Sequence, residues 1–223
     1  MRLLKILSVI LAPCLLAPCA LVALAEAPHK VSKWNFEDAA LGQLPKGWSA
    51  AQTGDGKGSV WKVVEDATAP QGSKVLAQTA ESTSVLFNLC VADDTEFKDV
   101  EVSVSFKAVQ GKSDQGGGLV WRYQDANNYY VARFNPLEDN FRLYKVVAGK
   151  RVQLESKEGL KAASGAWHTM SVSMQGNQIE CSLNGETYLE VLDDTFTKPG
   201  RVGLWTKADA QSEFDDFQIA AAQ

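Results

Sequence analysis

Histidine, cysteine and clustered basic residues are all scarce in this chain. The only histidines are His29 and His168, and no Cys/His cluster has the spacing of a zinc site, which excludes a zinc centre of the usual kinds. Residues 26–223 carry 20 basic and 27 acidic side chains, a net charge of −7, without a basic cluster. An acidic chain of this kind is a poor ligand for nucleic acid or anionic lipid, so both partners are excluded.

Helical periodicity is missing as well. After residue 25 no stretch longer than ten residues shows an amphipathic helical stripe, and residues 155–163 are expected to form at most one short helix or a turn. No second long apolar run follows the first one at the N-terminus, so no membrane span is expected once that segment is removed. The remaining 198 residues are enough for one domain with a substantial core.

The N-terminus has the three parts of a secretory signal. Arg2 and Lys5 precede an apolar run over 6–24, which ends in the small residues Ala23 and Ala25. The pattern predicts a signal peptide over 1–25 and a periplasmic or secreted domain over 26–223.

Two rival interpretations of this segment fit less well. Pro13 and Pro18 disfavour a stable helix that would anchor the chain in the membrane. A lipoprotein signal would use Cys14 or Cys19, and each follows Leu-Ala-Pro, which fits that signal poorly.

What the domain has in abundance is period-2 alternation. Val100, Val102, Val104 and Phe106 alternate with polar residues, which predicts a strand with one buried face. Asn184-Gly185 predicts a type I′ hairpin. Many short strands with turns between them indicate an all-β sandwich or jelly roll. Further strands are expected within 119–123, 129–134, 141–147, 151–155, 167–174, 179–183, 188–192, 199–207 and 213–219.

Two cysteines fall inside the domain, Cys90 and Cys181. An oxidising compartment permits a disulfide between them. Their positions fit two separate thiols buried in strands equally well, because free cysteine packs like a small hydrophobe.

Three blocks of sequence resemble one family. They open with Trp34-Asn-Phe-Glu-Asp, continue with Asp114-Gln-Gly-Gly-Gly-Leu-Val-Trp-Arg-Tyr, and close with Gly200-Arg-Val-Gly-Leu-Trp-Thr-Lys. Over residues 33–220 the chain resembles exported bacterial domains of the concanavalin A-like lectin/glucanase superfamily, near the DUF1080 group of 3-keto-disaccharide hydrolase-like domains. The resemblance implies a jelly-roll β-sandwich of two curved antiparallel sheets, with sugars usually bound on the concave face.

Laminarinase-like relatives in that superfamily carry catalytic carboxylates on one strand as Glu-x-Asp-x-x-Glu. Here Glu213 and Asp215 match the first two positions, but the last is Gln218, which cannot act as a general acid. The segment also lies close to the C-terminus, so we do not expect catalysis there. An alternative is a structural Ca²⁺ held where the chain ends pair, with Glu37, Asp215 and Asp216 as candidate ligands. No cofactor is required.

A polar and aromatic set on neighbouring strands is the candidate ligand site. Aromatic rings stack on the apolar faces of sugars, and guanidinium groups donate paired hydrogen bonds to hydroxyls or carboxylates. Glu138 and Asp139 are weak candidates for a catalytic base beside this set. The alternative is that the arginines pair with acids on neighbouring strands and the rings fill a sheet face. The predicted binding residues are Arg122, Tyr129, Arg133, Asn140, Arg142, Tyr144, Trp205 and Lys207.

Three functions remain open at this point. The first is an exported domain that binds a glycan or sugar derivative on its concave face. The second is a hydrolase acting on a 3-keto-glycoside through one base and an oxyanion stabiliser. The third is a structural or protein-binding domain of the cell envelope. His168 and four tryptophans (Trp34, Trp48, Trp61 and Trp167) are expected to be structural.

Overall fold

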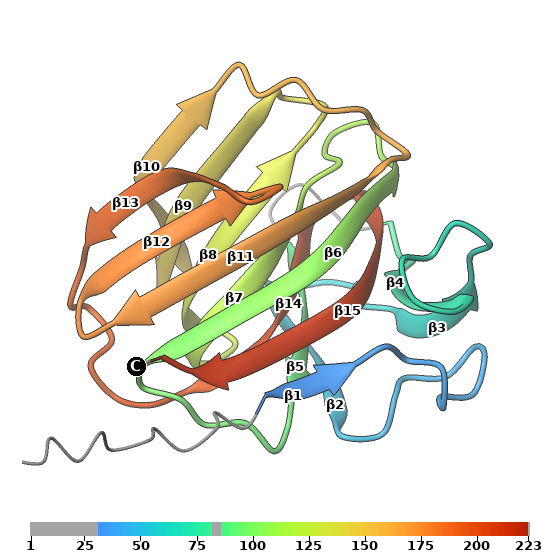
Figure 1. The fold of residues 1–223 in the computed structure, drawn as a ribbon, viewed down its shortest axis with the longest axis horizontal. Coiled ribbons are helices and arrows are strands. Elements are labelled where there is room, and N and C mark those ends of the chain that lie inside the picture. The colour runs from blue at the N-terminus through green and yellow to red at the C-terminus, as the bar shows by residue number, and fades with distance from the viewer. Residues whose placement is uncertain (1–30, 82–85, 223) are drawn as a thin grey trace, which may run out of the picture.

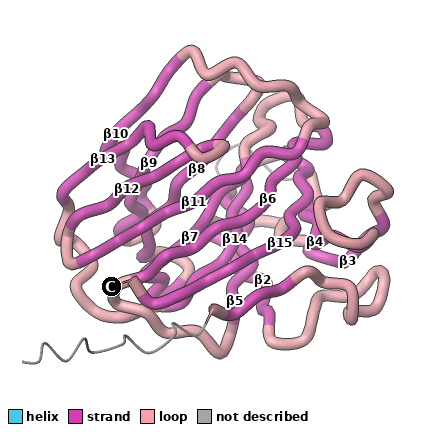
Figure 2. Tube along the Cα trace, in the orientation of Figure 1, coloured by secondary structure: helices cyan, strands magenta, loops and turns pink. Residues whose placement is uncertain are grey.

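The fold is all-β. A computed structural model describes residues 31–81 and 86–222, and this part of the chain contains strands, turns and loops but no helix (Figures 1 and 2). No helix that could cross a membrane is therefore found in it. The predicted signal peptide and its cysteines lie outside the described residues.

One layer of the sandwich is an eight-stranded antiparallel sheet, which faces the viewer in Figure 1. Its strand order is β13-β12-β11-β6-β15-β4-β3, and β1 pairs with β15, so the first and last described strands lie side by side. The strands are β1 (Ser32–Trp34), β3 (Trp61–Glu65), β4 (Lys74–Gln78), β6 (Val100–Gln110), β11 (Trp167–Gln175), β12 (Gln178–Leu183), β13 (Glu186–Leu192) and β15 (Gln211–Ala221).

The second layer is a seven-stranded antiparallel sheet in the order β10-β9-β8-β7-β14-β5-β2. It lies behind the first sheet in Figure 1. Its strands are β2 (Trp48–Thr53), β5 (Phe87–Ala92), β7 (Gly117–Asp125), β8 (Asn128–Asn135), β9 (Asn140–Val147), β10 (Lys150–Glu158) and β14 (Arg201–Lys207).

The main core lies between the two sheets. The alternating residues of β6 point inward, and Val104 and Phe106 are fully or almost fully buried there with Trp121 and Phe134 of the other sheet. Phe106 meets Phe134 edge to face, with ring centroids 6.3 Å apart. Each such side chain stabilises the fold by about 1.5–3 kcal/mol through removal of apolar surface from water.

The seven-stranded sheet curls strongly toward its outer face. Phe87 on β5 and Arg151 on β10 are separated by four intervening strands, which would put them about 24 Å apart in a flat sheet. The Arg151 guanidinium nevertheless lies 5.2 Å from the Phe87 ring centroid. Thr53 on β2 likewise reaches Tyr129 on β8, with 2.7 Å between their side-chain oxygens. The outer face is therefore concave, and it carries a second apolar cluster of its own.

The predicted fold class and the strands from residue 100 onward are confirmed. Asn184 and Gly185 have φ angles of 52° and 83°, as a type I′ hairpin requires. The short helix or turn expected over 155–163 is wrong in its first half, because β10 continues to Glu158. Strands β2 to β5 were not predicted, since their alternation is short and interrupted.

Candidate functional site

The concave face gathers seven of the eight predicted binding residues. Trp205, Gly118, Arg133 and Arg142 stand in one row across β14, β7, β8 and β9. Because side chains two apart share a face, four other predicted residues extend this row. They are Tyr129 on β8, Asn140 and Tyr144 on β9, and Lys207 on β14.

Arg133 is the fixed centre of this face, with a side chain that is 2 % exposed. Its Nη2 donates to Asp114 at 2.7 Å and to Glu138 at 3.2 Å. Asp114 in turn accepts a bond from the backbone N–H of Gly116 at 2.7 Å. A Cβ on Gly116 would lie 2.4 Å from Arg133 Nε, so this position needs glycine to let the guanidinium lie against the chain.

A more exposed rim surrounds Arg133. Arg142 bonds Glu158 at 3.1 Å and Glu138 at 3.3 Å. Partial burial alone would raise the pKa of Glu138, but hydrogen bonds from Arg133 and Asn140 and the charges of both arginines outweigh it and lower that pKa to about 2. Glu138 is therefore ionised at every physiological pH and is a weak base. Asp139 occupies the adjoining turn at φ 52°, outside the hydrogen bonds found among the described residues of this network.

An aromatic floor adjoins the polar rim. Tyr144 is 3 % exposed and Trp205 is fully buried, so neither ring face is open to solvent. Tyr129 is buried too, with its hydroxyl bonded to Thr53. The guanidinium of Arg151 lies 4.4 Å from the Tyr144 ring centroid and covers it.

Sequence reasoning missed Arg151 and Asp114. Arg151 pairs with Val146 in the β9–β10 register. Counting outward from the turn at Ala148 and Gly149, which joins β9 to β10, would have placed it on the same face as Tyr144. Asp114 gave no such signal, because it precedes β7 and reaches Arg133 only through the tertiary fold.

Arg122 is not part of this site, and its predicted role is wrong. A register shift between Trp121 and Asp125, together with a φ of 44° at Arg122, breaks the alternation of β7. The side chain instead donates to the carbonyl oxygens of Lys98 at 2.8 Å and Gly176 at 2.7 Å, and also to the carbonyl of Phe196. It joins three loops at one end of the sandwich.

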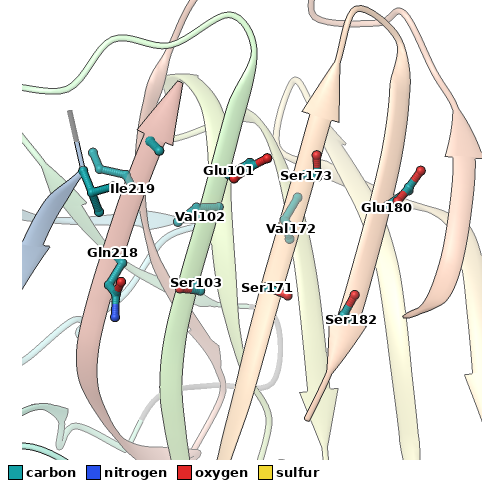
Figure 3. Close-up of a pocket in the computed structure, with 12 residues that line it drawn as sticks. Glu101, Val102, Ser103, Ser171, Val172, Ser173, Glu180, Ser182, Gln218 and Ile219 are labelled. Atoms are coloured by element: carbon teal, nitrogen blue, oxygen red, sulfur yellow. The ribbon is translucent and has the colours of Figure 1, made fainter. Parts of the chain in front are cut away.

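The opposite face of the molecule carries a shallow groove of about 350 Å³, which the sequence did not indicate (Figure 3). Glu101 on β6 and Glu180 on β12 both pair with Ser173 on β11, so two carboxylates flank one hydroxyl in a single row. The residues that line it include Ser103, Ser171 and Ser182 but no aromatic side chain. The groove thus offers hydrogen bonds without a stacking platform.

Comparison with known proteins identifies the family. A model of the 3-keto-alpha-glucoside-1,2-lyase-like domain matches residues 36–220. The chain belongs to this family. A search of the curated proteins finds no match.

Two solved structures with the same fold have names that refer to carbohydrates. The carbohydrate-binding module CBM66 from Bacillus subtilis superposes with a TM-score of 0.63 at 14 % identity, covering 78 % of this chain and 96 % of that one. The β-glucanase of Bacillus licheniformis superposes with a TM-score of 0.59 at 12 % identity, covering 86 % and 98 %. At these identities the likeness shows a shared fold.

In this lyase-like domain the segment that resembles the laminarinase motif is engaged in structural contacts. Glu213 lies on the outer face of the eight-stranded sheet with its carboxylate 2.6 Å from Lys107. Asp215 is fully buried and accepts a bond from the backbone N–H of Gln71 at 2.8 Å. Burial, with the charges of Asp216 and Glu37 as further causes, raises the pKa of Asp215 to about 6.

Two of the three candidate calcium ligands of the lyase-like domain accept hydrogen bonds from backbone N–H groups, and the third, Asp216, accepts one from the side chain of Gln218. Glu37 accepts bonds from the N–H groups of Ser73 at 2.8 Å and Lys74 at 2.6 Å, while Asp215 accepts from Gln71 and Asp216. Over residues 31–81 and 86–222 no group of three or more His, Cys, Asp or Glu side chains is arranged to hold a metal ion. The donor set therefore does not fit a calcium ion.

The disulfide alternative is wrong, and the alternative of two buried thiols holds. Cys90 on β5 and Cys181 on β12 are both free and fully buried. Burial raises the pKa of both thiols. His168 has the structural position expected of it, since its ring meets Phe134 edge to face and its Nε2 lies 3.1 Å from the Ala163 carbonyl.

Proposed function

We propose that this domain binds a carbohydrate on the concave face of its seven-stranded sheet. The observation that carries the proposal is the convergence of guanidinium groups and aromatic rings on one curled surface. Arg133 and Arg142 come from β8 and β9, and the rings of Tyr144 and Trp205 come from β9 and β14. Sugars are recognised by this combination of ring faces and directed donors.

The fixed position of Arg133 adds to this argument. Its guanidinium is held by Asp114 and Glu138, so its geometry is set before any ligand arrives. Donors that need no reorganisation cost less conformational entropy on binding. The groove on the other face lacks an aromatic platform, which makes it the weaker candidate for a sugar.

Binding should be measured by calorimetry on the purified protein with sucrose, trehalose, maltose, cellobiose and their 3-keto derivatives. Arg142→Ala removes a half-exposed rim donor and should weaken binding about tenfold, which is the worth of one charged hydrogen bond of about 1.4 kcal/mol. Glu180→Ala in the groove is the matched control and should bind like the wild type. Weaker binding in Glu180→Ala with unchanged binding in Arg142→Ala would move the site to the groove.

The family favours a second candidate, an enzyme that acts on a 3-keto-glycoside. Proton abstraction beside a ketone needs a base, and Glu138 is weakened for that role by its bonds from Arg133 and Asn140. We therefore rank binding ahead of turnover. Incubation with the 3-keto disaccharides, followed by detection of released monosaccharide, should show no turnover. Release that Glu138→Gln abolishes would establish the enzyme instead.

Failure to bind any of these sugars would leave the third function, a structural or protein-binding envelope domain. The periplasmic or secreted location rests on residues 1–25. It is tested by the N-terminal sequence of the exported protein, which should begin at Glu26.

A further inference from the structure

Arg151 covers the aromatic floor of the concave face. Its guanidinium carbon lies 4.4 Å from the ring centroid of Tyr144, 5.2 Å from that of Phe87 and 6.0 Å from that of Trp205. These rings come from β9, β5 and β14, so one side chain covers aromatic groups of three strands. A planar guanidinium over these ring faces occupies the position that a stacked ligand would take.

The guanidinium is poorly satisfied in this position. Its Nη1 is buried and has no hydrogen-bond partner among the described residues. Burial lowers the pKa of Arg151, and repulsion from the nearby Arg133 lowers it further. A buried donor without an acceptor destabilises the state that contains it. The side chain can therefore leave the covered state for water, which satisfies all of its donors.

The strand that carries Arg151 is suited to such a movement. Among the described strands, β10 is an edge strand whose one sheet partner is β9. Its register shifts between Gln153 and Glu155, and most of its side chains are exposed or half-exposed. Edge strands with few buried contacts are among the less stable parts of a sheet protein.

We propose that Arg151 is a displaceable cover of the carbohydrate site, so that a sugar binds to the aromatic floor only after this guanidinium has moved away. The inference rests on the proposed function and says how that site is regulated. It also accounts for why Trp205 and Tyr144 are closed to solvent although they form the floor. The occupied and open states differ in the position of one side chain, and the sugar selects the open one.

Removal of the guanidinium is the first test. The probe is whichever of sucrose, trehalose, maltose and cellobiose the wild type binds most tightly. Arg151→Ala should bind this sugar at least tenfold more tightly than the wild type, because no cover has to be displaced. Arg151→Lys keeps a cation over the rings and should stay within about threefold of the wild type. Lys150→Ala, on the same strand with an exposed side chain, is the matched control and should bind like the wild type.

The Nε–H resonance of Arg151 in the wild-type protein provides a second test that depends on no variant. In the covered state the guanidinium lies beside the rings of Tyr144, Phe87 and Trp205, so their ring currents displace this resonance, and saturation with the bound sugar should return it toward the position of an exposed arginine. A resonance that does not change at saturation overturns the inference.

The outcomes separate this inference from the proposed function. Binding by the wild type, with equal or weaker binding by Arg151→Ala, overturns the cover alone and leaves a carbohydrate site in which Arg151 is a contact or a bystander. Absence of binding in the wild type and in every variant refutes the proposed function and the cover together. Tighter binding by Arg151→Ala, with Arg151→Lys unchanged, supports both.

Discussion

The buried ion pair of Arg133 and Asp114 allows a sharp test of the architecture of the concave face. The two side chains are 2 % and 0 % exposed, and 2.7 Å separates Arg133 Nη2 from Asp114 Oδ2. Arg133→Met keeps an unbranched side chain of similar length but removes the charge and its donors. The carboxylate of Asp114 is then left buried without its closest partner.

The expected loss can be worked out from these contacts. Breaking a buried pair by removing one partner costs about 3–5 kcal/mol, mainly because an uncompensated charge stays inside. Asp114 would still accept a bond from the Gly116 N–H at 2.7 Å and would keep Lys207 Nζ at 3.7 Å. We therefore expect the lower end, about 3 kcal/mol, or a fall of about 6–12 °C in Tm for a domain of this size.

Arg142→Met is the matched control, because Arg142 faces Arg133 directly across β8 and β9. Its side chain is 26 % exposed and its partners Glu138 and Glu158 are more exposed still. Exposed pairs of this kind contribute at most about 1 kcal/mol. The free energy of unfolding should therefore fall by about 1 kcal/mol or less in Arg142→Met.

Urea unfolding followed by tryptophan fluorescence measures both losses. The double variant Asp114→Asn/Arg133→Met removes the stranded charge and should regain at least half of what Arg133→Met loses. Equal losses in Arg133→Met and Arg142→Met would refute the reasoning. A double variant that loses as much stability as Arg133→Met and Asp114→Asn lose when added together would also refute it, because the two side chains would then not interact.

Three other predictions follow from buried groups elsewhere in the fold. Gly117→Ala places a Cβ 2.2 Å from the ring of Phe106 and should lower the free energy of unfolding by about 1–3 kcal/mol through overpacking. Urea unfolding measures this loss, and an unchanged midpoint would mean that the ring moves freely. Burial raises the pKa of Asp215 in the folded protein to about 6 from its ordinary value of 3.8, so its contribution to stability is fully present at low pH and is lost as pH rises from about 4 through 6. Asp215→Asn should abolish that part of the pH dependence of unfolding, and an unchanged profile would assign it to other groups. Cys90 and Cys181 should resist alkylation in the native protein, and both should react after denaturation under non-reducing conditions. Peptide mass mapping measures this, and a disulfide-linked pair of peptides would contradict the free thiols.

The strands that the sequence predicted best are those with long, uninterrupted alternation. Val100 to Phe106 repeat on every second position, and the structure buries all four of the apolar members. Local alternation was equally sufficient to put Arg133 and Arg142 on one face. It failed at Arg122, where a bulge reverses the direction of the side chain, because no local sequence pattern predicts that bulge.

The sequence predicted most residues of the site but not whether the site is open or closed. The sequence offered two alternatives, an open ligand site or arginines paired with acids, and the structure contains elements of both. Arg133 is paired with Asp114, which lies 19 positions earlier, while the rings beside it are closed by Arg151, which lies 18 positions later. Both partners depend on how far the sheet curls.

By itself the sequence determined the all-β class, most of the strands, the hairpin at Asn184-Gly185 and the family. These follow from short-range patterns, because the direction of a side chain in a strand depends on its neighbours two positions away. Only the tertiary structure decided that β10 is carried over the face of β5, that Arg151 covers Trp205, and that two carboxylates flank Ser173 on the other side. Strand order and curvature are set by packing between segments far apart in the chain, and no local pattern contains that information.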